Sequence, residues 1–335
     1  MKLLKYNDIR LLIKKVGIEN FIQGVHDTLR EDFYRWQDFN MSPRHAFHYP
    51  DGVIELMPTT TNKLYSFKYV NGHPVNTKQN KLSIIAMGLL ADVDSGFPLL
   101  LCDMTLLTAI RTAATSALAM GHLAKKNSDV MALIGTGAQS EFQSIAAHQI
   151  LGVNKIQYFD IDTKAMEKFS ANLQPYNIEL FPCNSVQEVL LNADIITTAT
   201  AKKLKVNLLT SQDLKPGMFI NSIGGDCPGK TELHPEIIRE HLTVVDFLEQ
   251  AKIEGEIQNL TDTNNIIQLR EIIQGSKPGR VSDEQITVFD SVGCAIEDFS
   301  VLRYTYKLAC DLKIGDCDNF LPCPKDPKNL FELIS

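Results

Sequence analysis

The segment of the chain that could most directly do chemistry is a glycine turn between an apolar run and a helical run. Residues 130–134 are apolar and typical of a buried strand, and Gly135 and Gly137 follow them. Residues 138–151 are typical of a helix whose first backbone amides would face the turn. Because such a turn can hold a pyrophosphate, the segment predicts a dinucleotide site.

An aspartate further along the chain supports this prediction. Asp160 ends the next apolar run, 25 residues after Gly135, where its carboxylate can accept hydrogen bonds from an adenosine ribose. The same charge would repel a 2′-phosphate and no arginine follows it, so Asp160 favours NAD over NADP. The third glycine of the usual fingerprint is Ser140 here, which predicts slightly looser packing of the helix on the strand.

A candidate acid/base follows another apolar run, residues 218–223. Gly224 and Gly225 let the backbone approach a ligand, and Asp226 comes next. Ligands of open α/β sheets bind at the carboxyl ends of strands, which puts Asp226 where a substrate would meet a nicotinamide. The alternative interpretation of Asp226 is a residue that only caps its turn, and Lys230 could equally be a surface lysine.

Four further charged residues could hold an amino-acid substrate. Arg111 lies in a helical run of small and apolar residues, and its neighbours one turn away offer no carboxylate, which indicates an external anion. Lys68 lies on the mixed face of an expected strand and Arg44 in a polar stretch before it; a carboxylate substrate needs such cations. Glu55 interrupts an apolar strand and could meet a substrate amine. Each of the four could instead be a solvated residue.

The elements that must position these residues fall into two groups. From residue 152 to about residue 300, short apolar runs alternate with helical stretches, which predicts a parallel, doubly wound sheet of the Rossmann type. The first hundred residues contain apolar runs that predict strands of an antiparallel sheet, namely 64–70, 83–91 and 97–102. A hairpin is expected at residues 92–96.

This division predicts an α/β protein with two domains. Residues 1–125 would form an α+β domain for substrate binding and dimerisation, and residues 126–312 the dinucleotide-binding domain. The leucine- and alanine-rich run 105–124 would be the connecting helix. Prolines limit helix formation near the C-terminus, and residues 313–335 are expected to pack back on the first domain.

Composition and charge exclude several classes of protein. The 335 residues, 44% of them hydrophobic, are enough for two globular domains. The net charge is −7 and the chain has no basic run, so the sequence does not indicate a surface that binds nucleic acid. No apolar run suits a membrane span or a signal peptide, which predicts a cytoplasmic protein. Neither the 7 cysteines nor the 8 histidines have the spacing of a metal site, so no metal is expected.

Several longer runs match one known family. They include Gly52-Val-Ile-Glu-Leu-Met-Pro58, Phe67-Lys-Tyr-Val-Asn-Gly-His-Pro74, Arg111-Thr-Ala-Ala-Thr-Ser116, Gly224-Gly-Asp-Cys-Pro-Gly-Lys-Thr-Glu-Leu-His234 and Val288-Phe-Asp-Ser-Val-Gly293. With these runs the sequence resembles the ornithine cyclodeaminase and mu-crystallin family over almost its whole length.

The resemblance implies a homodimeric enzyme that converts L-ornithine to L-proline and ammonia with a tightly held NAD, which takes up a hydride and returns it. Asp226 would be the catalytic acid/base. The substrate would contact Arg44, Glu55, Lys68, Arg111, Ser291 and Val292. The cofactor would contact Ser83, Arg111, Gly135, Gly137, Ala138, Gln139, Asp160, Thr200, Asn221, Ser222, Ile223 and Lys230. Ser83 stands where the family pattern has a threonine.

Other activities stay open at this point. An amino-acid dehydrogenase or a ketimine reductase would share the fold but use NAD(P)H as a true cosubstrate. Lysine could replace ornithine, because one methylene in a pocket is worth only about 1–3 kcal/mol. A crystallin-like protein that binds a nucleotide without turnover is the third alternative. Asp226 beside Lys68 and Arg111 argues against it, since a passive binder has less need of an acid/base.

Overall fold

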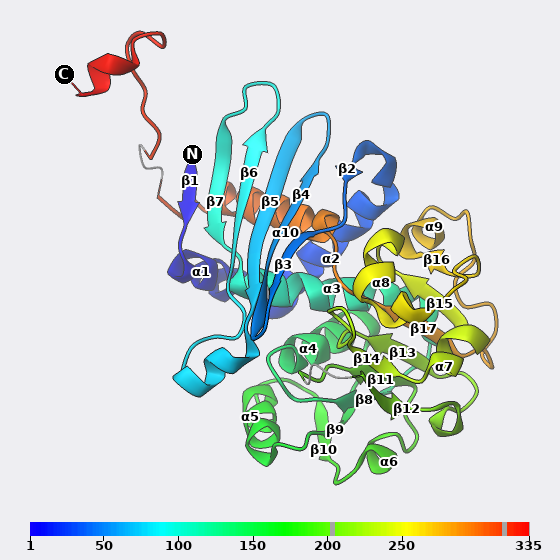
Figure 1. The fold of residues 1–335 in the computed structure, drawn as a ribbon. Coiled ribbons are helices and arrows are strands. Elements are labelled where there is room, and N and C mark those ends of the chain that lie inside the picture. The colour runs from blue at the N-terminus through cyan, green and yellow to red at the C-terminus, as the bar shows by residue number, and fades with distance from the viewer. Residues whose placement is uncertain (202–204, 317–319, 335) are drawn as a thin grey trace.

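The computed structural model describes residues 1–201, 205–316 and 320–334. It contains a mixed sheet and a parallel sheet, which Figure 1 shows as two halves of the molecule. Helix α3 (Thr105–Leu123) joins the last strand of the mixed sheet to the first strand of the parallel sheet, and most of its side chains are buried. The expected α/β class, with a Rossmann-type sheet and a sheet of antiparallel strands, is confirmed.

The mixed sheet has the strand order β1-β7-β6-β5-β4-β2, with β3 also paired to β4. Its strands are β1 (Lys2–Leu4), β2 (Asn40–Met41), β3 (His45–Tyr49), β4 (Gly52–Thr60), β5 (Leu64–Gly72), β6 (Ala86–Asp92) and β7 (Pro98–Asp103). Only β1 runs parallel to its neighbour. The expected strand 83–91 begins at Ala86, because residues 73–85 form an excursion that carries the 3-10 helix η2 (Pro74–Gln79).

Helices cover one face of this sheet, and the other face is open. Along β5, Lys68 and Val70 are buried, whereas Tyr65 points to the open face, as the two-residue period of a strand requires. Helix α10 packs directly on β4, β5 and β6, and α2 packs against α10 and α3. The helices on this side are α1 (Tyr6–Val16), α2 (Ile18–Tyr34), α3 and α10 (Ala295–Asp311).

The second sheet has the order β10-β9-β8-β11-β13-β17-β15-β16 and is parallel throughout. Its strands are β8 (Val130–Ile134), β9 (Lys155–Phe159), β10 (Glu179–Pro182), β11 (Ile195–Thr198), β13 (Phe219–Ser222), β15 (Leu242–Val245), β16 (Ile267–Gln268) and β17 (Thr287–Asp290). The order reverses at β8, which lies between β9 and β11. Ligands of doubly wound sheets bind at the carboxyl ends of the strands beside such a reversal.

Short helices and a separate strand pair complete this half. The α-helices are α4 (Ser140–Leu151), α5 (Thr163–Leu173), α6 (Val186–Val189), α7 (Pro235–Glu240), α8 (Leu248–Glu254) and α9 (Leu269–Ile273). Strands β12 (Lys205–Leu209) and β14 (Thr231–Leu233) pair with each other. The remaining 3-10 helices are η1 (Trp36–Asp38), η3 (Ser211–Asp213), η4 (Glu256–Asn259) and η5 (Leu330–Ile334). Within the described ranges, no helix combines the length and apolar composition that crossing a membrane requires.

Helix α10 crosses the expected domain boundary. It follows the last strand of the parallel sheet, yet it packs on the mixed sheet and on α2. Phe299 of α10 is fully buried and meets Phe39 edge to face, with ring centroids 4.9 Å apart. We propose that residues 295–312 belong with residues 1–125, and the other limits of the two domains stay predictions.

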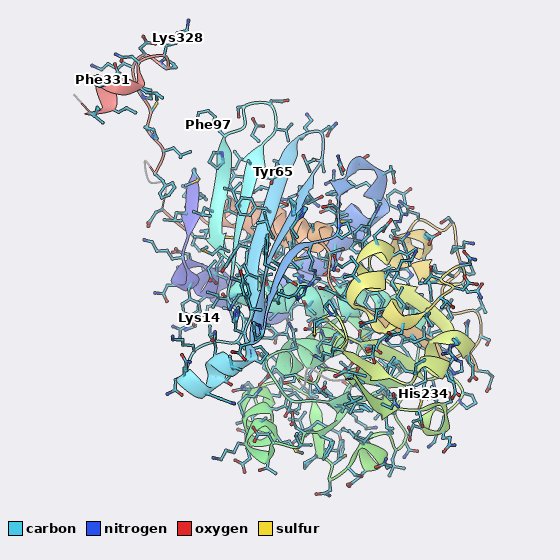
Figure 2. The ribbon with its side chains drawn as sticks, viewed as in Figure 1. Lys14, Tyr65, Phe97, His234, Lys328 and Phe331 are labelled. Carbon is cyan, nitrogen blue, oxygen red and sulfur yellow. The ribbon has the colours of Figure 1, made fainter. Side chains whose placement is uncertain are left out.

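The C-terminal segment starts at the edge of the mixed sheet. Asp316 forms an antiparallel bridge with Leu3 of β1. Figures 1 and 2 show residues 320–334, with Phe331 among them, projecting beyond this edge instead of lying on the sheet. Contact with the first half is therefore seen only at the beginning of the segment 313–335. Residues 317–319 and 335 of that segment lie outside the described residues.

Candidate active site

A cavity of about 160 Å³ lies between the two halves of the molecule. Its walls come from strands β4 and β5, from helix α3 and from the loops that follow β13 and β17. It brings together nine of the residues singled out in the sequence: Arg44, Glu55, Lys68, Arg111, Gln139, Ile223, Asp226, Ser291 and Val292. The expected acid/base and the expected substrate cations thus share one cavity, although they are far apart in the sequence.

Lys68 and Arg111 enter the cavity side by side and share a carboxylate. The side chain of Lys68 is 1% exposed, and its Nζ donates to Asp298 Oδ1 at 2.8 Å. Arg111 Nε lies 3.2 Å from the same oxygen, and Nη1 also donates to Glu297. The sequence argument that Arg111 lacks a carboxylate partner is therefore wrong. The partners come from α10, which is remote in the sequence and packs against α3.

Arg44 is tied to both halves of the molecule. Its Nη1 lies 3.2 Å from Glu55 Oε1 and 3.3 Å from Glu254 Oε2. Its Nη2 donates to the carbonyl oxygen of Val292 at 2.5 Å and to that of Gly293 at 2.7 Å. Glu55 therefore has a cationic partner inside the protein, while its contact with a substrate amine stays a prediction. Burial raises the pKa of Glu254 to about 7.

Asp226 follows the turn that Gly224 and Gly225 form, and its side chain is 54% exposed. Its carboxylate accepts a hydrogen bond from Lys230, whose Nζ lies 3.1 Å from Asp226 Oδ1. Lys230 is itself buried and also donates to the carbonyl oxygen of Thr200 at 2.8 Å. The surface-lysine interpretation of Lys230 is therefore wrong, and this lysine connects Asp226 to the loop after β11.

The glycine turn after β8 has the geometry that a dinucleotide requires. Gly135 has φ +101°, and a Cβ there would lie 2.6 Å from the carbonyl oxygen of Ala199, so a side chain does not fit. A Cβ built on Gly137 meets nothing within 4 Å, which leaves the loop accessible from that side. Asp160 Oδ2 accepts a hydrogen bond from the backbone N of Thr136 at 2.7 Å. The acidic residue therefore lies directly beside the turn, as the ribose assignment requires.

Other expected cofactor residues surround this turn. The Gln139 side-chain oxygen and the Asn221 Oδ1 are buried without a hydrogen-bond partner in the described part of the chain. Such atoms are uncommon in folded proteins and are consistent with a polar ligand at the site. Ala138 is exposed in the turn before α4, whereas Ser83 lies on the 73–85 excursion and does not line the cavity.

Behind the expected cofactor contacts lies a group of buried carboxylates that the sequence argument missed. Glu232 accepts hydrogen bonds from the backbone N and the hydroxyl of Thr200, and Glu256 accepts one from the Ser222 hydroxyl at 3.0 Å. Burial, together with the neighbouring Glu232, raises the pKa of Glu256 to about 7. Burial and the neighbouring Glu256 also raise the pKa of Asp290 well above its ordinary value.

These raised pKa values predict that the folded protein loses stability as the pH rises. Glu256 holds a proton in the folded state up to about pH 7, whereas the unfolded chain releases it near 4.5. Over this window the folded state binds more protons, so its free energy of unfolding should fall by up to about 3 kcal/mol from Glu256. Melting curves should show that Glu256→Gln flattens this decline. The prediction would be contradicted if the melting temperature of the wild type rose between pH 5 and pH 7 and that of Glu256→Gln rose in parallel.

The signal for the missed residues is weak in the sequence. Glu297 and Asp298 begin a helical run, where acidic residues are common for their interaction with the helix dipole. Glu254 ends the short helix α8 and looks like a solvated residue. Only the packing of α10 on the mixed sheet and of α8 beside Arg44 gives these carboxylates their role.

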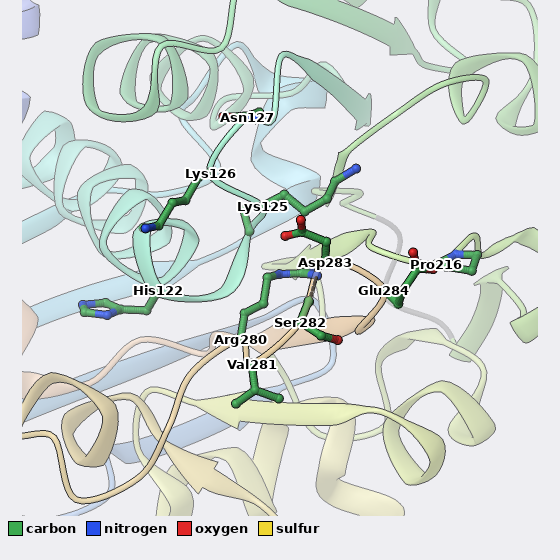
Figure 3. A pocket seen from close by; sticks show the side chains of 12 residues that line it. His122, Lys125, Lys126, Asn127, Pro216, Arg280, Val281, Ser282, Asp283 and Glu284 are labelled. Carbon is green, nitrogen blue, oxygen red and sulfur yellow. Dashed lines mark hydrogen bonds between the residues drawn. The ribbon is translucent and has the colours of Figure 1, made fainter.

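A wider hollow of about 750 Å³ lies elsewhere, between the end of α3 and residues 280–284 (Figure 3). Two of its basic side chains, Lys125 and Arg280, are already bound within the protein. Lys125 pairs with Asp194 at 2.9 Å, and Arg280 donates to backbone carbonyl groups, among them that of Leu123 at 2.7 Å. This hollow contains none of the residues expected at the active site.

Comparison with known sequences agrees with this arrangement. The model of the ornithine cyclodeaminase/mu-crystallin family matches residues 7–312. An ornithine cyclodeaminase of Agrobacterium fabrum is 49% identical over 323 residues, which cover 96% of this chain and 91% of that protein. An alanine dehydrogenase of Archaeoglobus fulgidus is 33% identical over 309 residues, covering 90% of this chain and 93% of that protein.

Solved structures show the same fold. A lysine cyclodeaminase, described for its recognition of L-lysine, L-ornithine and L-2,4-diaminobutyric acid, superimposes with a TM-score of 0.91 at 26% identity and covers 99% of this chain and 98% of its own. An archaeal alanine dehydrogenase dimer with bound NAD gives a TM-score of 0.87 at 30% identity, covering 96% of this chain and 99% of its own. The chain belongs to the ornithine cyclodeaminase/mu-crystallin family.

Proposed function

We propose that this protein is an NAD-dependent cyclodeaminase that converts L-ornithine to L-proline and ammonia. The observation that carries the proposal is the cavity in which Asp226 faces Arg44, Lys68 and Arg111, beside a glycine turn suited to a dinucleotide. The 49% identity to an ornithine cyclodeaminase over nearly the whole chain supports ornithine as substrate.

The cationic and the acidic residues of the cavity would have different roles. Lys68 and Arg111, with Arg44 beside them, would bind the substrate carboxylate through charge-assisted hydrogen bonds. Asp226 would accept a proton from the α-ammonium group, because a carboxylate that lines the cavity can act as a general base. Lys230 would orient the Asp226 carboxylate through their 3.1 Å contact.

The residues around the glycine turn would hold the cofactor. Gly135, Gly137 and the following backbone amides suit the pyrophosphate, and Asp160 suits the adenosine ribose. When bound, NAD supplies reversible hydride transfer. The buried side-chain oxygens of Gln139 and Asn221 would find hydrogen-bond partners on the cofactor.

We further propose that the protein is a homodimer that works in the cytoplasm. The open face of the mixed sheet carries a row of apolar side chains across neighbouring strands, with Leu56 opposite Tyr69 and Tyr69 opposite Met87. Leu56 is 39% exposed and Met87 is 53% exposed, and apolar faces of this kind are typical of protein interfaces. A related alanine dehydrogenase was solved as a dimer.

The balance of products tests the proposed activity. Incubated with L-ornithine and NAD, the protein should form proline and ammonia in equal amounts while NADH absorbance stays flat, since the overall reaction involves no net oxidation. Steady NADH accumulation in proportion to product would instead favour an amino-acid dehydrogenase. Parallel assays with L-lysine and L-alanine separate the other family activities.

A further inference from the structure

Asp298 lies behind the active-site cavity, between two of the cations that line it. One of its oxygens accepts a hydrogen bond from Lys68 Nζ at 2.8 Å and lies 3.2 Å from Arg111 Nε. Lys68 and Arg111 both line the cavity, whereas Asp298 does not. The side chain of Asp298 is 1% exposed, so it does not exchange its two partners for water.

We propose that Asp298 is a positioning residue, which holds the Lys68 ammonium and the Arg111 guanidinium side by side so that both face one anionic group in the cavity. This inference rests on the proposed function, in which that group is the substrate carboxylate. Asp298 acts through the two cations and is not itself in contact with the substrate.

Electrostatics explains why such a residue is needed. Two buried cations side by side repel each other, and burial followed by the charge of Arg111 lowers the pKa of Lys68 to about 8. Asp298 opposes this through its charge and its hydrogen bond, while Arg44 lowers the Lys68 pKa further. Without the Asp298 carboxylate, Lys68 would lose its proton at a lower pH and would attract an anion less strongly at neutral pH.

Packing fixes the second cation in the same orientation. Glu297, the residue before Asp298, binds Arg111 Nη1 from α10. Gly293 has φ +82°, and a Cβ there would lie 2.5 Å from Arg111 Nη1. Glu297 of α10 therefore binds the guanidinium on one side. On another side Gly293 packs against it, where there is no room for a larger residue. Asp298 is the group that connects this arrangement to Lys68.

The test compares Asp298→Asn with Asp32→Asn. Asp32 is an equally buried carboxylate that contacts α10, where it pairs with Arg303 at 3.1 Å and accepts a hydrogen bond from Ser300. It does not line the cavity, so it controls for the loss of a buried charge. Steady-state constants for L-ornithine should be measured between pH 6.5 and pH 9, with melting temperature and NAD titration as checks on folding.

Asp298→Asn should raise the KM for ornithine at least about tenfold at pH 8, with a smaller change in kcat. The ratio of its KM to the wild-type KM should fall as the pH is lowered, because protonation restores the Lys68 charge. Asp32→Asn should leave KM and its pH dependence unchanged, whatever its melting temperature. If Asp298→Asn does not fold, Asp298→Glu carries the test, since it retains the charge and displaces the carboxylate, and it should also raise KM.

Two outcomes overturn the inference alone: an active wild type whose Asp298 variants keep the wild-type KM across this pH range, or an equal rise of KM in Asp32→Asn. A wild type that forms no proline from ornithine would overturn the proposed function, and this inference with it.

Discussion

Asp226→Asn should lower proline formation by roughly 10²- to 10⁴-fold at saturating ornithine, the usual contribution of a positioned acid/base. Asparagine has nearly the same size, but it cannot accept the α-ammonium proton. The fold should survive, because the Asp226 side chain is 54% exposed and pairs with Lys230 at the edge of the cavity. NAD affinity, measured by fluorescence titration, should therefore stay close to that of the wild type.

Asp262→Asn is a matched control for this substitution. Asp262 is an exposed loop aspartate whose carboxylate accepts a hydrogen bond from the backbone N of Asn264, and it does not line the cavity. Its variant should keep the wild-type turnover. Near-normal proline formation by Asp226→Asn would refute the catalytic assignment. A joint loss of turnover and NAD binding would indicate that Asp226 has a structural role.

Arg111→Ala should have the second large effect, on both substrate binding and stability. Charge-assisted hydrogen bonds to a carboxylate are worth on the order of 1.5–3 kcal/mol, so the KM for ornithine should rise roughly ten- to hundredfold. The substitution also leaves Glu297 and Asp298 buried without their shared cation, which should cost about 3–5 kcal/mol of folding stability.

Two further variants separate these effects. Arg111→Lys keeps a charge near Glu297 but loses the planar guanidinium. Relative to Arg111→Ala, it should therefore restore more of the folding stability than of the affinity for ornithine. Arg303→Ala removes an arginine from the outer part of α10, where it pairs with Glu31 and Asp32, and should leave KM unchanged. An Arg111→Ala variant with the wild-type KM would show that this arginine does not bind substrate.

Local sequence patterns were sufficient for much of the fold and for the cofactor side of the site. The strand, glycine turn and helix around Gly135 are consecutive in the chain, and Asp160 ends the neighbouring strand, so their proximity follows from the order of a βαβ unit. The alternation along β5 likewise distinguished the Lys68 face from the face of Tyr65.

The ion pairs of the cavity could not be predicted from local sequence patterns. Lys68 and Asp298 are 230 positions apart, and they meet only because α10 leaves the parallel sheet and packs on the mixed sheet. The residues one turn from Arg111 on its own helix include no carboxylate, whereas its partners come from α10. A chain segment that changes sheets leaves no periodic signal in the sequence.

The fate of the substrate α-hydrogen tests the central proposal most directly. The wild-type protein, supplied with NAD and L-ornithine carrying deuterium at Cα, should release proline that retains deuterium at Cα, as mass spectrometry and NMR can measure. Retention is expected because the hydrogen removed from Cα is returned within the same active site. Proline with only protium at Cα, or a failure to form proline while NADH accumulates, would contradict the proposal.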